Sequence, residues 1–304
     1  MNKRIAAIHD LSGFGKCSLT IILPILSACG LEACPLPTAF LSSHTGGLPG
    51  FTHRDLTSDL LPAARQWSEL KLRFDGIYSG FLGSLEQISK VSEIFDLLSG
   101  RDTLIFVDPC MADNGKLYQT YSSDMARGTQ LLCHKADFIL PNLTEACLLL
   151  NEPYRPERYR TREAVARLAQ DLAARFQCGV VLTGIGFSPE QTGAACLAGP
   201  GGADWRSWRG SAGCWLAGPG DEPAFAFSQK VARHYHGTGD LFASVFVAAK
   251  MKGLEIGRCA QIAADFVSDT IARTVRDGTD ERYGVNFEQG IPDLISRFQK
   301  EALL

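Results

Sequence analysis

Short apolar runs alternate with helix-like segments over most of the chain, and this alternation is the feature that most restricts its fold. Runs typical of buried strands occur at residues 4–9, 35–41, 74–79, 103–107, 137–140 and 180–183. Apolar residues at helical spacing occur at residues 19–26, 56–72 and 85–98. Strands that alternate with helices predict one parallel sheet that is covered by helices.

The last third of the chain has a different composition. Residues 191–217 are rich in glycine, contain Trp205, Trp208 and Trp215, and are typical of antiparallel hairpins at one edge of the sheet. Helical patterns follow at residues 240–251, 256–275 and 287–304. The charged stretch at 155–162 is interpreted as a solvated loop, and no repeat or linker divides the chain. We therefore expect a single domain over residues 1–304.

Composition excludes several classes of function. The 304 residues carry a net charge of −3 without a basic block, so neither nucleic acid nor a membrane surface is an expected partner. The apolar stretch at the N-terminus is too short for a signal peptide, and no run of apolar residues is long enough to span a bilayer. The ten cysteines are scattered and form no C-x-x-C pair, so we expect reduced thiols in a cytoplasmic protein.

A glycine-flanked turn precedes the helical pattern at 240–251. Gly237, Thr238 and Gly239 stand directly before Asp240. A helix that opens at such a turn offers unpaired backbone N–H groups, which suit a phosphate. Asp240 either caps the helix or takes a proton from a hydroxyl that attacks phosphorus, and these residues alone leave both interpretations open.

The first turn of the chain, at residues 10–18, resembles two phosphate-binding motifs without matching either. A P-loop needs an earlier glycine that is absent, and it needs Ser or Thr where Cys17 stands. The dinucleotide motif needs a third glycine where Ser18 stands. Neither motif is supported.

Polar residues follow the predicted strands and are expected to share one edge of the sheet, because ligands of open parallel sheets bind beyond the carboxyl ends of the strands. They are Asp10, Ser12, His44, Thr45, Asp108, Asn142, Glu145 and Thr183. Each alone is explained as a turn or capping residue. Together they favour a ligand site, in which Asp108 and Glu145 suit Mg²⁺.

Five motifs in order resemble those of the pyridoxal kinases of the ribokinase-like superfamily, over almost the whole chain. They are Ser43-His44-Thr45-Gly46, Tyr78-Ser79-Gly80-Phe81, Val107-Asp108-Pro109, Pro141-Asn142-Leu143-Thr144-Glu145-Ala146 and Gly237-Thr238-Gly239-Asp240-Leu241-Phe242. The resemblance implies a three-layer α/β/α sandwich with a mostly parallel sheet and an antiparallel edge. It also implies transfer of the γ-phosphate of ATP to the 5′-hydroxymethyl group of a B6 vitamer.

The resemblance also assigns roles. Asp240 is the implied base, and Gly237, Thr238 and Gly239 stabilise the transferring phosphoryl group. Mg²⁺ is implied at Asp108 and Glu145 with assistance from Asp113, and the nucleotide at Asn142, Thr183, Gly184, Val231 and His236. The implied vitamer pocket contains Asp10, Ser12, His44, Thr45 and Phe81. A monovalent cation such as K⁺ and a homodimer are usual in the family.

The sequence departs from the family at the vitamer pocket. Asp10 stands where many pyridoxal kinases have serine, Phe81 where they have tyrosine, and Lys16-Cys17-Ser18 replaces a glycine-bearing turn. A carboxylate at position 10 is expected to shift preference towards pyridoxamine or an aminopyrimidine. The alternatives are a hydroxymethylpyrimidine kinase of thiamin synthesis and a catalytically silent relative that binds pyridoxal.

Overall fold

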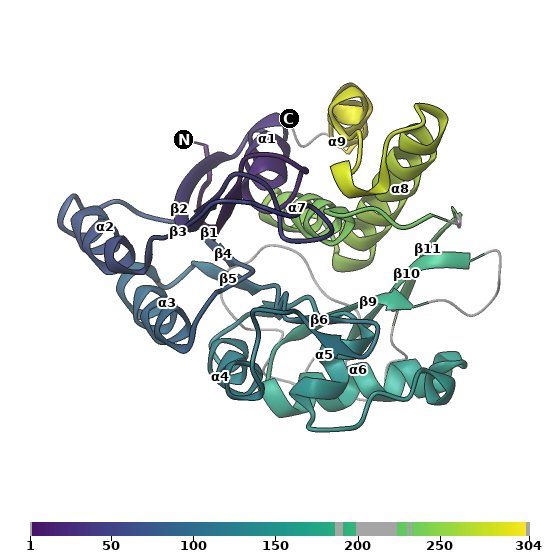
Figure 1. The fold of residues 1–304 in the computed structure, drawn as a ribbon, viewed down its shortest axis with the longest axis horizontal. Coiled ribbons are helices and arrows are strands. Elements are labelled where there is room, and N and C mark those ends of the chain that lie inside the picture. Colours follow the sequence, from purple (N-terminus) through teal and green to yellow (C-terminus); the bar gives the residue numbers. More distant parts are fainter. Residues whose placement is uncertain (1, 186–190, 199–223, 230, 232, 302–304) are drawn as a thin grey trace.

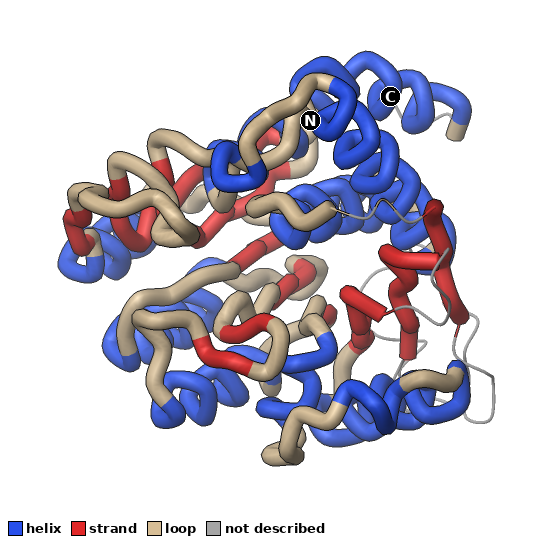
Figure 2. Tube along the Cα trace, turned by 45° about the vertical axis from the view of Figure 1, so that its right-hand side comes forward, coloured by secondary structure: helices blue, strands red, loops and turns tan. Residues whose placement is uncertain are grey.

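The computed structural model describes residues 2–185, 191–198, 224–229, 231 and 233–301. These residues form three layers, a central sheet between two layers of helices (Figures 1 and 2). The expected α/β/α sandwich is therefore confirmed. The three tryptophans of the glycine-rich stretch lie outside the described residues.

Nine of the described strands form one large sheet. Their order across it is β11 (Ala224–Gln229), β10 (Gln191–Ala198), β9 (Gly179–Ile185), β8 (Phe138–Ile139), β5 (Leu104–Val107), β4 (Gly76–Ser79), β1 (Arg4–Ser12), β2 (Glu32–Leu41) and β3 (His53–Asp55). The pairs from β9 to β2 are all parallel, whereas β10 and β11 are antiparallel, as expected for that edge. The opposite edge, β3, is also antiparallel, which the sequence did not predict because its three residues are all exposed.

Helices cover both faces of the sheet. One face carries α1 (Leu19–Ala28), α7 (Thr238–Met251), α8 (Ile256–Arg276) and α9 (Ile291–Lys300) (Figure 1). The other carries α2 (Thr57–Glu69), α3 (Leu85–Leu98), α4 (Ser123–Cys133), α5 (Leu143–Leu149) and α6 (Arg162–Phe176). The shorter elements are the hairpin β6–β7 (Ala112–Asp113 and Lys116–Leu117) and the 3₁₀ turns η1 (Pro156–Tyr159), η3 (Glu281–Tyr283) and η4 (Glu288–Gly290).

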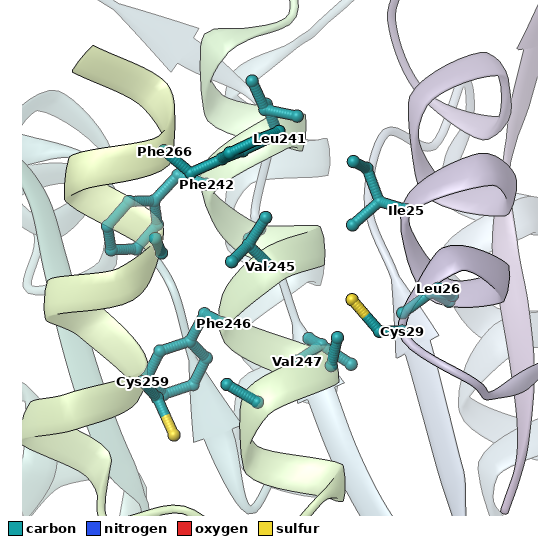
Figure 3. Close-up of a cluster of buried hydrophobic side chains, with 14 of the residues drawn as sticks. Ile25, Leu26, Cys29, Leu241, Phe242, Val245, Phe246, Val247, Cys259 and Phe266 are labelled. Atoms are coloured by element: carbon teal, nitrogen blue, oxygen red, sulfur yellow. The ribbon is translucent and has the colours of Figure 1, made fainter. Parts of the chain in front are cut away.

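Helix α7 is buried over most of its length and fixes the position of the glycine turn before it. Every residue of α7 from 241 to 251 is buried. Its apolar side chains lie between α1 on one side and α8 on the other (Figure 3). Each such side chain contributes about 1.5–3 kcal/mol on burial, so the start of α7 is held rigidly at the edge of the sheet.

Two sequence-based expectations concern the chemistry of the whole chain. The thiols of eight cysteines are free, namely Cys17, Cys29, Cys34, Cys110, Cys133, Cys147, Cys178 and Cys259. Among the described residues, no helix combines the length and the apolar character needed to cross a membrane.

Candidate active site

Strands β4, β5 and β8 end at one level of the sheet, and β1, β2 and β9 continue a few residues past it. We call this edge, together with the start of α7, the rim. Ser79 of β4 lies opposite Ile8 of β1 and Val107 of β5. Asp10 and Asp108 follow these positions closely, so both reach the same edge of the sheet. The register of β1 against β2 shifts at this level, between His9 and Leu11.

The turn before α7 requires glycine at its first position. Gly237 has a φ of 79°, and a Cβ there would lie 2.1 Å from the carbonyl oxygen of Lys16. A Cβ at Gly239 would meet no atom within 4 Å, so this side of the turn is open. Thr238 Oγ1 donates to the carbonyl of Tyr235 at 3.3 Å. The start of α7 thus has free space beside its first N–H groups, as an anion site needs.

Asp240 does not cap the helix in which it lies. Gly237 is the N-cap residue of α7, and no side-chain cap bond is present there. Instead, Asp240 Oδ2 accepts a hydrogen bond of 2.9 Å from the backbone N–H of Ser18, on the turn before α1. Burial raises the pKa of Asp240 to about 6, the Ser18 N–H opposes that rise, and the charge of Asp10 adds to it. Such a carboxyl group is suited to accept a proton near neutral pH.

Asp10 is buried and already has partners for both carboxylate oxygens. Ser18 Oγ donates to Oδ1 at 2.6 Å, and Ser12 Oγ donates to Oδ2 at 2.8 Å. Burial raises the pKa of Asp10, and the two hydroxyl groups oppose the rise. Asp10 and Ser12 therefore stabilise each other at the rim, so a ligand that contacts Asp10 shares it with two serines.

The segment with His44 and Thr45 borders the rim from the side of β2. His44 is buried, its Nδ1 accepts from the N–H of Gly46 at 3.0 Å, and its Nε2 lies 2.6 Å from the carbonyl oxygen of Arg282. These partners assign the hydrogen to Nε2 and leave the ring faces, not the nitrogens, for a ligand. Thr45 is exposed, and the half-buried Phe81 packs against Tyr121.

Asp108 and Glu145 are brought together as expected, but they differ in their hydrogen bonds. Glu145 is buried, and its carboxylate accepts from the N–H groups of Met111, Ala112 and Asn142 at 2.8, 3.4 and 2.9 Å. Burial raises the pKa of Glu145 to about 7. Burial, followed by the charges of Glu145 and Asp240, raises the pKa of Asp108 well above its usual range.

Asp113 does not join these two carboxylates in a metal-binding group. It is exposed in the β6–β7 hairpin, where its carboxylate accepts from the backbone and side chain of Asn114. In the described ranges no three His, Cys, Asp or Glu side chains gather as a metal site. The half-buried Asp108 has uncompensated negative neighbours, which fits a divalent cation supplied with a nucleotide.

Asn142 follows β8, and it lies beside Thr183 and Gly184 in the last residues of β9. Asn142 caps α5: its Oδ1 accepts from the N–H of Glu145 at 3.0 Å, and its Nδ2 donates to the carbonyl of Ala112 at 2.7 Å. Thr183 bridges to Asn142 through the backbone, and Gly184 adopts a φ of 69° that favours glycine. The side chain of Asn142 is thus occupied within the protein, Thr183 is half-buried with its hydroxyl 3.4 Å from the carbonyl oxygen of Pro141, and Gly184 is exposed.

His236 connects the glycine turn to the His44 segment. It is exposed, and its ring centroid lies 4.5 Å from that of His44. Val231 is half-buried. Arg233 and Tyr235, which lie between Val231 and His236 in the sequence, border a cavity of about 480 Å³. The rest of its wall is formed by Val275 and residues 278–282. The segment expected to lie near adenine therefore flanks a hollow of the size that a small ligand needs.

Two residues of the rim were absent from the sequence-based prediction. Ser18 bonds both Asp240 and Asp10, and Cys110 lies close enough to Asp108, Asp240 and Glu145 for their charges to raise the pKa of its thiol beyond the effect of burial. Cys110 follows a strand end by three residues, a position that could have marked it. For Ser18 the only signal was its place in the turn after β1.

Comparisons with known proteins agree with this geometry. The family model of phosphomethylpyrimidine kinase matches residues 25–284. A Bacteroides thetaiotaomicron protein whose crystal structure is described as that of a phosphomethylpyrimidine kinase is 35% identical, with 96% of this chain and 94% of that chain covered and a TM-score of 0.85. A second crystal form of such a protein from that organism contains pyridoxal.

Pyridoxal kinases are also similar. The enzyme of Lactobacillus plantarum is 25% identical over 98% of both chains, with a TM-score of 0.83. That of Leishmania donovani, in complex with ADP and pyridoxamine, shares the fold at 18% identity over 96% of both chains, with a TM-score of 0.79. No curated protein matches the chain significantly. Because the family model covers most of the sequence and the fold is that of the ribokinase-like superfamily, the chain belongs to the phosphomethylpyrimidine kinase family.

Proposed function

We propose that the chain is an ATP-dependent kinase that phosphorylates the 5′-hydroxymethyl group of a B6 vitamer, with Asp240 as the general base. The observation that carries the proposal is the placement of Asp240. Its carboxylate lies at the start of α7, beside an open glycine turn, and is held by the N–H of Ser18 and not by its own helix.

The chemistry that follows is an in-line displacement. The hydroxyl oxygen of the substrate bonds to the γ-phosphorus, the bond from that phosphorus to ADP breaks, and the hydroxyl proton passes to Asp240. The N–H groups of Gly237, Thr238 and Gly239 stabilise the negative charge on the transferring group. With a pKa of about 6, Asp240 is ionised near neutral pH and is ready to accept that proton.

The nucleotide is bound by the part of the rim that contains Asp108, Glu145, Thr183 and Gly184. Asp108 is the residue best placed to ligate Mg²⁺ directly, whereas Glu145, which accepts three backbone hydrogen bonds, acts through water. When bound, the cation neutralises the phosphates of the nucleotide. Thr183 and Gly184 approach those phosphates, and the cavity beside Val231 and His236 takes the adenine.

A hydroxymethylpyrimidine is the second candidate substrate. It is favoured by the family model and by the 35% identical Bacteroides thetaiotaomicron protein, which is described as a phosphomethylpyrimidine kinase. The vitamer is favoured by the crystal form from that organism that contains pyridoxal and by the pyridoxal kinase of Lactobacillus plantarum. Both substrates present a hydroxymethyl group on a flat nitrogen heterocycle, so one base at position 240 serves either.

Turnover tests this proposal directly. In the presence of Mg²⁺ and K⁺, the rates of ATP-dependent phosphorylation are compared between four substrates: pyridoxal, pyridoxamine, pyridoxine and hydroxymethylpyrimidine. We expect a vitamer to give the highest kcat/KM, and turnover of the pyrimidine alone would assign the second candidate.

Asp240→Asn should lower kcat at least about 100-fold, as expected for loss of a general base, and leave pyridoxal binding intact. Full turnover by this variant would exclude Asp240 as the base, and lost binding would make Asp240 structural.

A further inference from the structure

We propose that Ser18 is a positioning residue that holds the carboxylate of Asp240 by bridging it to Asp10. This inference rests on the proposed function, in which Asp240 deprotonates the substrate. The family model begins at residue 25, so Asp10 and Ser18 both lie outside the part of the chain that it matches.

The bridge consists of consecutive hydrogen bonds across three elements. The backbone N–H of Ser18 donates to Asp240 Oδ2 of α7 at 2.9 Å, and Ser18 Oγ donates to Asp10 Oδ1 of β1 at 2.6 Å. Ser12 Oγ donates to the other oxygen of Asp10 at 2.8 Å. Ser18, Asp10 and Ser12 are all buried, so water does not compete strongly for these bonds.

The backbone of Ser18 is strained for this purpose. Its φ is 50° and its ψ is −132°, a conformation that non-glycine residues rarely adopt. Ser18 also stands at the N-cap of α1, where a serine side chain usually accepts a bond from the helix, yet it makes no such bond. The hydroxyl is directed to Asp10 instead. Strain of this kind persists where the surroundings fix the residue, and it gathers at functional sites.

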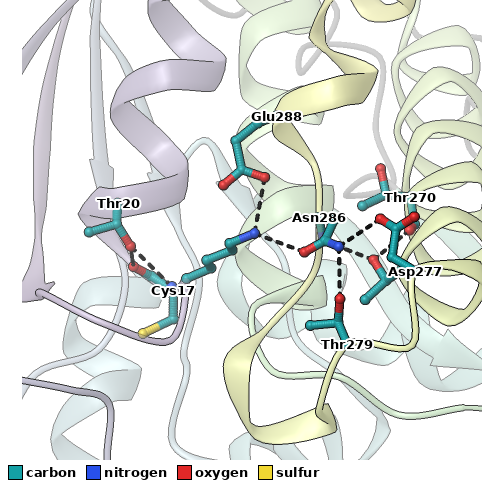
Figure 4. Close-up of polar contacts among 9 residues, drawn as sticks. Cys17, Thr20, Thr270, Asp277, Thr279, Asn286 and Glu288 are labelled. Atoms are coloured by element: carbon teal, nitrogen blue, oxygen red, sulfur yellow. Dashed lines mark hydrogen bonds and ion pairs between the residues drawn. The ribbon is translucent and has the colours of Figure 1, made fainter.

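The turn that carries Ser18 is anchored on both sides of the bridge. Lys16 Nζ binds Asn286 Oδ1 at 3.0 Å and Glu288 Oε2 at 3.1 Å, and Thr20 Oγ1 donates to the carbonyl of Cys17 at 2.7 Å (Figure 4). The missing side chain of Gly237 lets the carbonyl of Lys16 lie against the glycine turn. The peptide N–H of Ser18 therefore has a fixed direction before any substrate binds.

This arrangement separates two roles within one serine. The N–H orients the base, and the hydroxyl fixes the peptide to which that N–H belongs. Without the bond to Asp10, the peptide can rotate and the carboxylate of Asp240 loses its set orientation towards the hydroxyl that it deprotonates. Misplacement of a reacting group by a fraction of an ångström to 1 Å lowers a rate by about 10- to 100-fold.

The Ser18→Gly variant tests the bridge, because glycine keeps the N–H and tolerates the positive φ, while the CH₂OH side chain that bonds Asp10 is removed. We expect kcat to fall about tenfold, while KM for ATP and for the vitamer changes less than about twofold. Thr161→Gly is the control: it removes the side chain of another helix N-cap residue, at the exposed start of α6 and with no bond to either carboxylate, and its kcat should equal that of the wild type. An unchanged kcat in Ser18→Gly overturns the proposal.

A double-mutant cycle with Asp10→Asn distinguishes a bridge from general damage. If Ser18 acts through Asp10, the double variant should lose little more kcat than the worse single variant. Additive losses, or an equal loss in Thr161→Gly, contradict the bridge. If the wild type phosphorylates none of the four substrates, the proposed function is wrong, but the bridge can still be tested. The same double-mutant cycle is then carried out with the midpoint of chemical unfolding as the measured quantity. Coupling between positions 10 and 18 there supports the link, and its absence rejects it.

Discussion

At the scale of single residues, the rim concentrates negative charge that the fold does not balance. Burial raises the pKa values of Asp10, Asp108, Glu145 and Asp240, and like charges add to the rise for Asp108 and Asp240. Such an arrangement costs stability in the free protein. Under the proposed function it becomes favourable when a cation and a substrate hydroxyl occupy the site, which is the usual exchange of stability for activity.

For Asp240, this cost in stability can be measured as a pH dependence of the unfolding free energy. Its folded-state pKa of about 6 exceeds the unfolded value of about 3.9, so the folded chain binds the proton more tightly. The stability that the protonated group contributes is complete below about pH 4 and is lost as the pH rises through 6. Asp240→Asn, which still accepts the bond from Ser18, should therefore be more stable than the wild type by about 3 kcal/mol at about pH 8, and the difference should vanish near pH 4.

Urea unfolding at several pH values, without nucleotide or metal, measures this difference. Asp113→Asn is the comparison, since it makes the same change of side chain at an exposed position. A constant stability difference for Asp240→Asn across the pH range would contradict the raised pKa.

What the sequence could predict at this scale depends on whether a residue acts in a local motif. Asp240 and Asp108 follow a glycine turn and a strand end, patterns that are visible in the chain. The bond from Ser18 to Asp240 spans 222 positions and uses a backbone N–H, so no sequence pattern marks it. Likewise, Asn142 was expected to contact the nucleotide, but its side chain caps α5 and binds Ala112.

At the scale of elements, the start of α5 connects one strand end of the rim to the next. Asn142 and Glu145 form a capping box, and both also bind the loop after Asp108: Glu145 accepts from the N–H of Met111, and Asn142 donates to the carbonyl of Ala112. One short helix thus fixes the backbone next to the candidate metal ligand. The alternation of strands and helices was predictable from apolar spacing, whereas a link of this kind depends on how the elements dock.

Asn142→Ala should therefore affect both stability and activity. Loss of the cap and of the bond to Ala112 is expected to cost about 2 kcal/mol of unfolding free energy. The freed loop should also raise the Mg²⁺ concentration that gives half-maximal turnover. Thr161→Ala is the matched control, because Thr161 caps the exposed start of α6 through a bond of 3.3 Å and has no contact with the rim. It should lose about 1 kcal/mol or less with unchanged turnover. An equal effect of both variants on the Mg²⁺ dependence would contradict the link.

At the scale of the whole molecule, one segment near the N-terminus and one near the C-terminus pack together beside Asp240. The turn at residues 13–18 packs against the segment from Asp280 to Glu288: Lys16 binds Glu288, Phe14 lies 5.1 Å from Tyr283 between ring centroids, and His44 binds the carbonyl of Arg282. The exposed ion pair of Lys16 contributes little by itself. Close backbone packing at Gly284 defines the contact instead.

Gly284→Ala tests whether this distant contact supports the site. Gly284 has a φ of 80°, and a Cβ there would lie 2.4 Å from the carbonyl oxygen of Gly15. Gly253 at the far end of α7 also has a positive φ, of 94°, but a Cβ there would meet no atom within 4 Å. Both alanine variants pay about 1–2 kcal/mol for the left-handed backbone, and only Gly284→Ala adds about 1–3 kcal/mol of steric strain. Because that strain displaces the turn that carries Ser18, Gly284→Ala should also lower kcat several-fold, while Gly253→Ala retains the wild-type kcat. Thermal unfolding and steady-state kinetics on the two variants decide the matter: equal kcat values would mean that the C-terminal segment stabilises the fold without supporting the base.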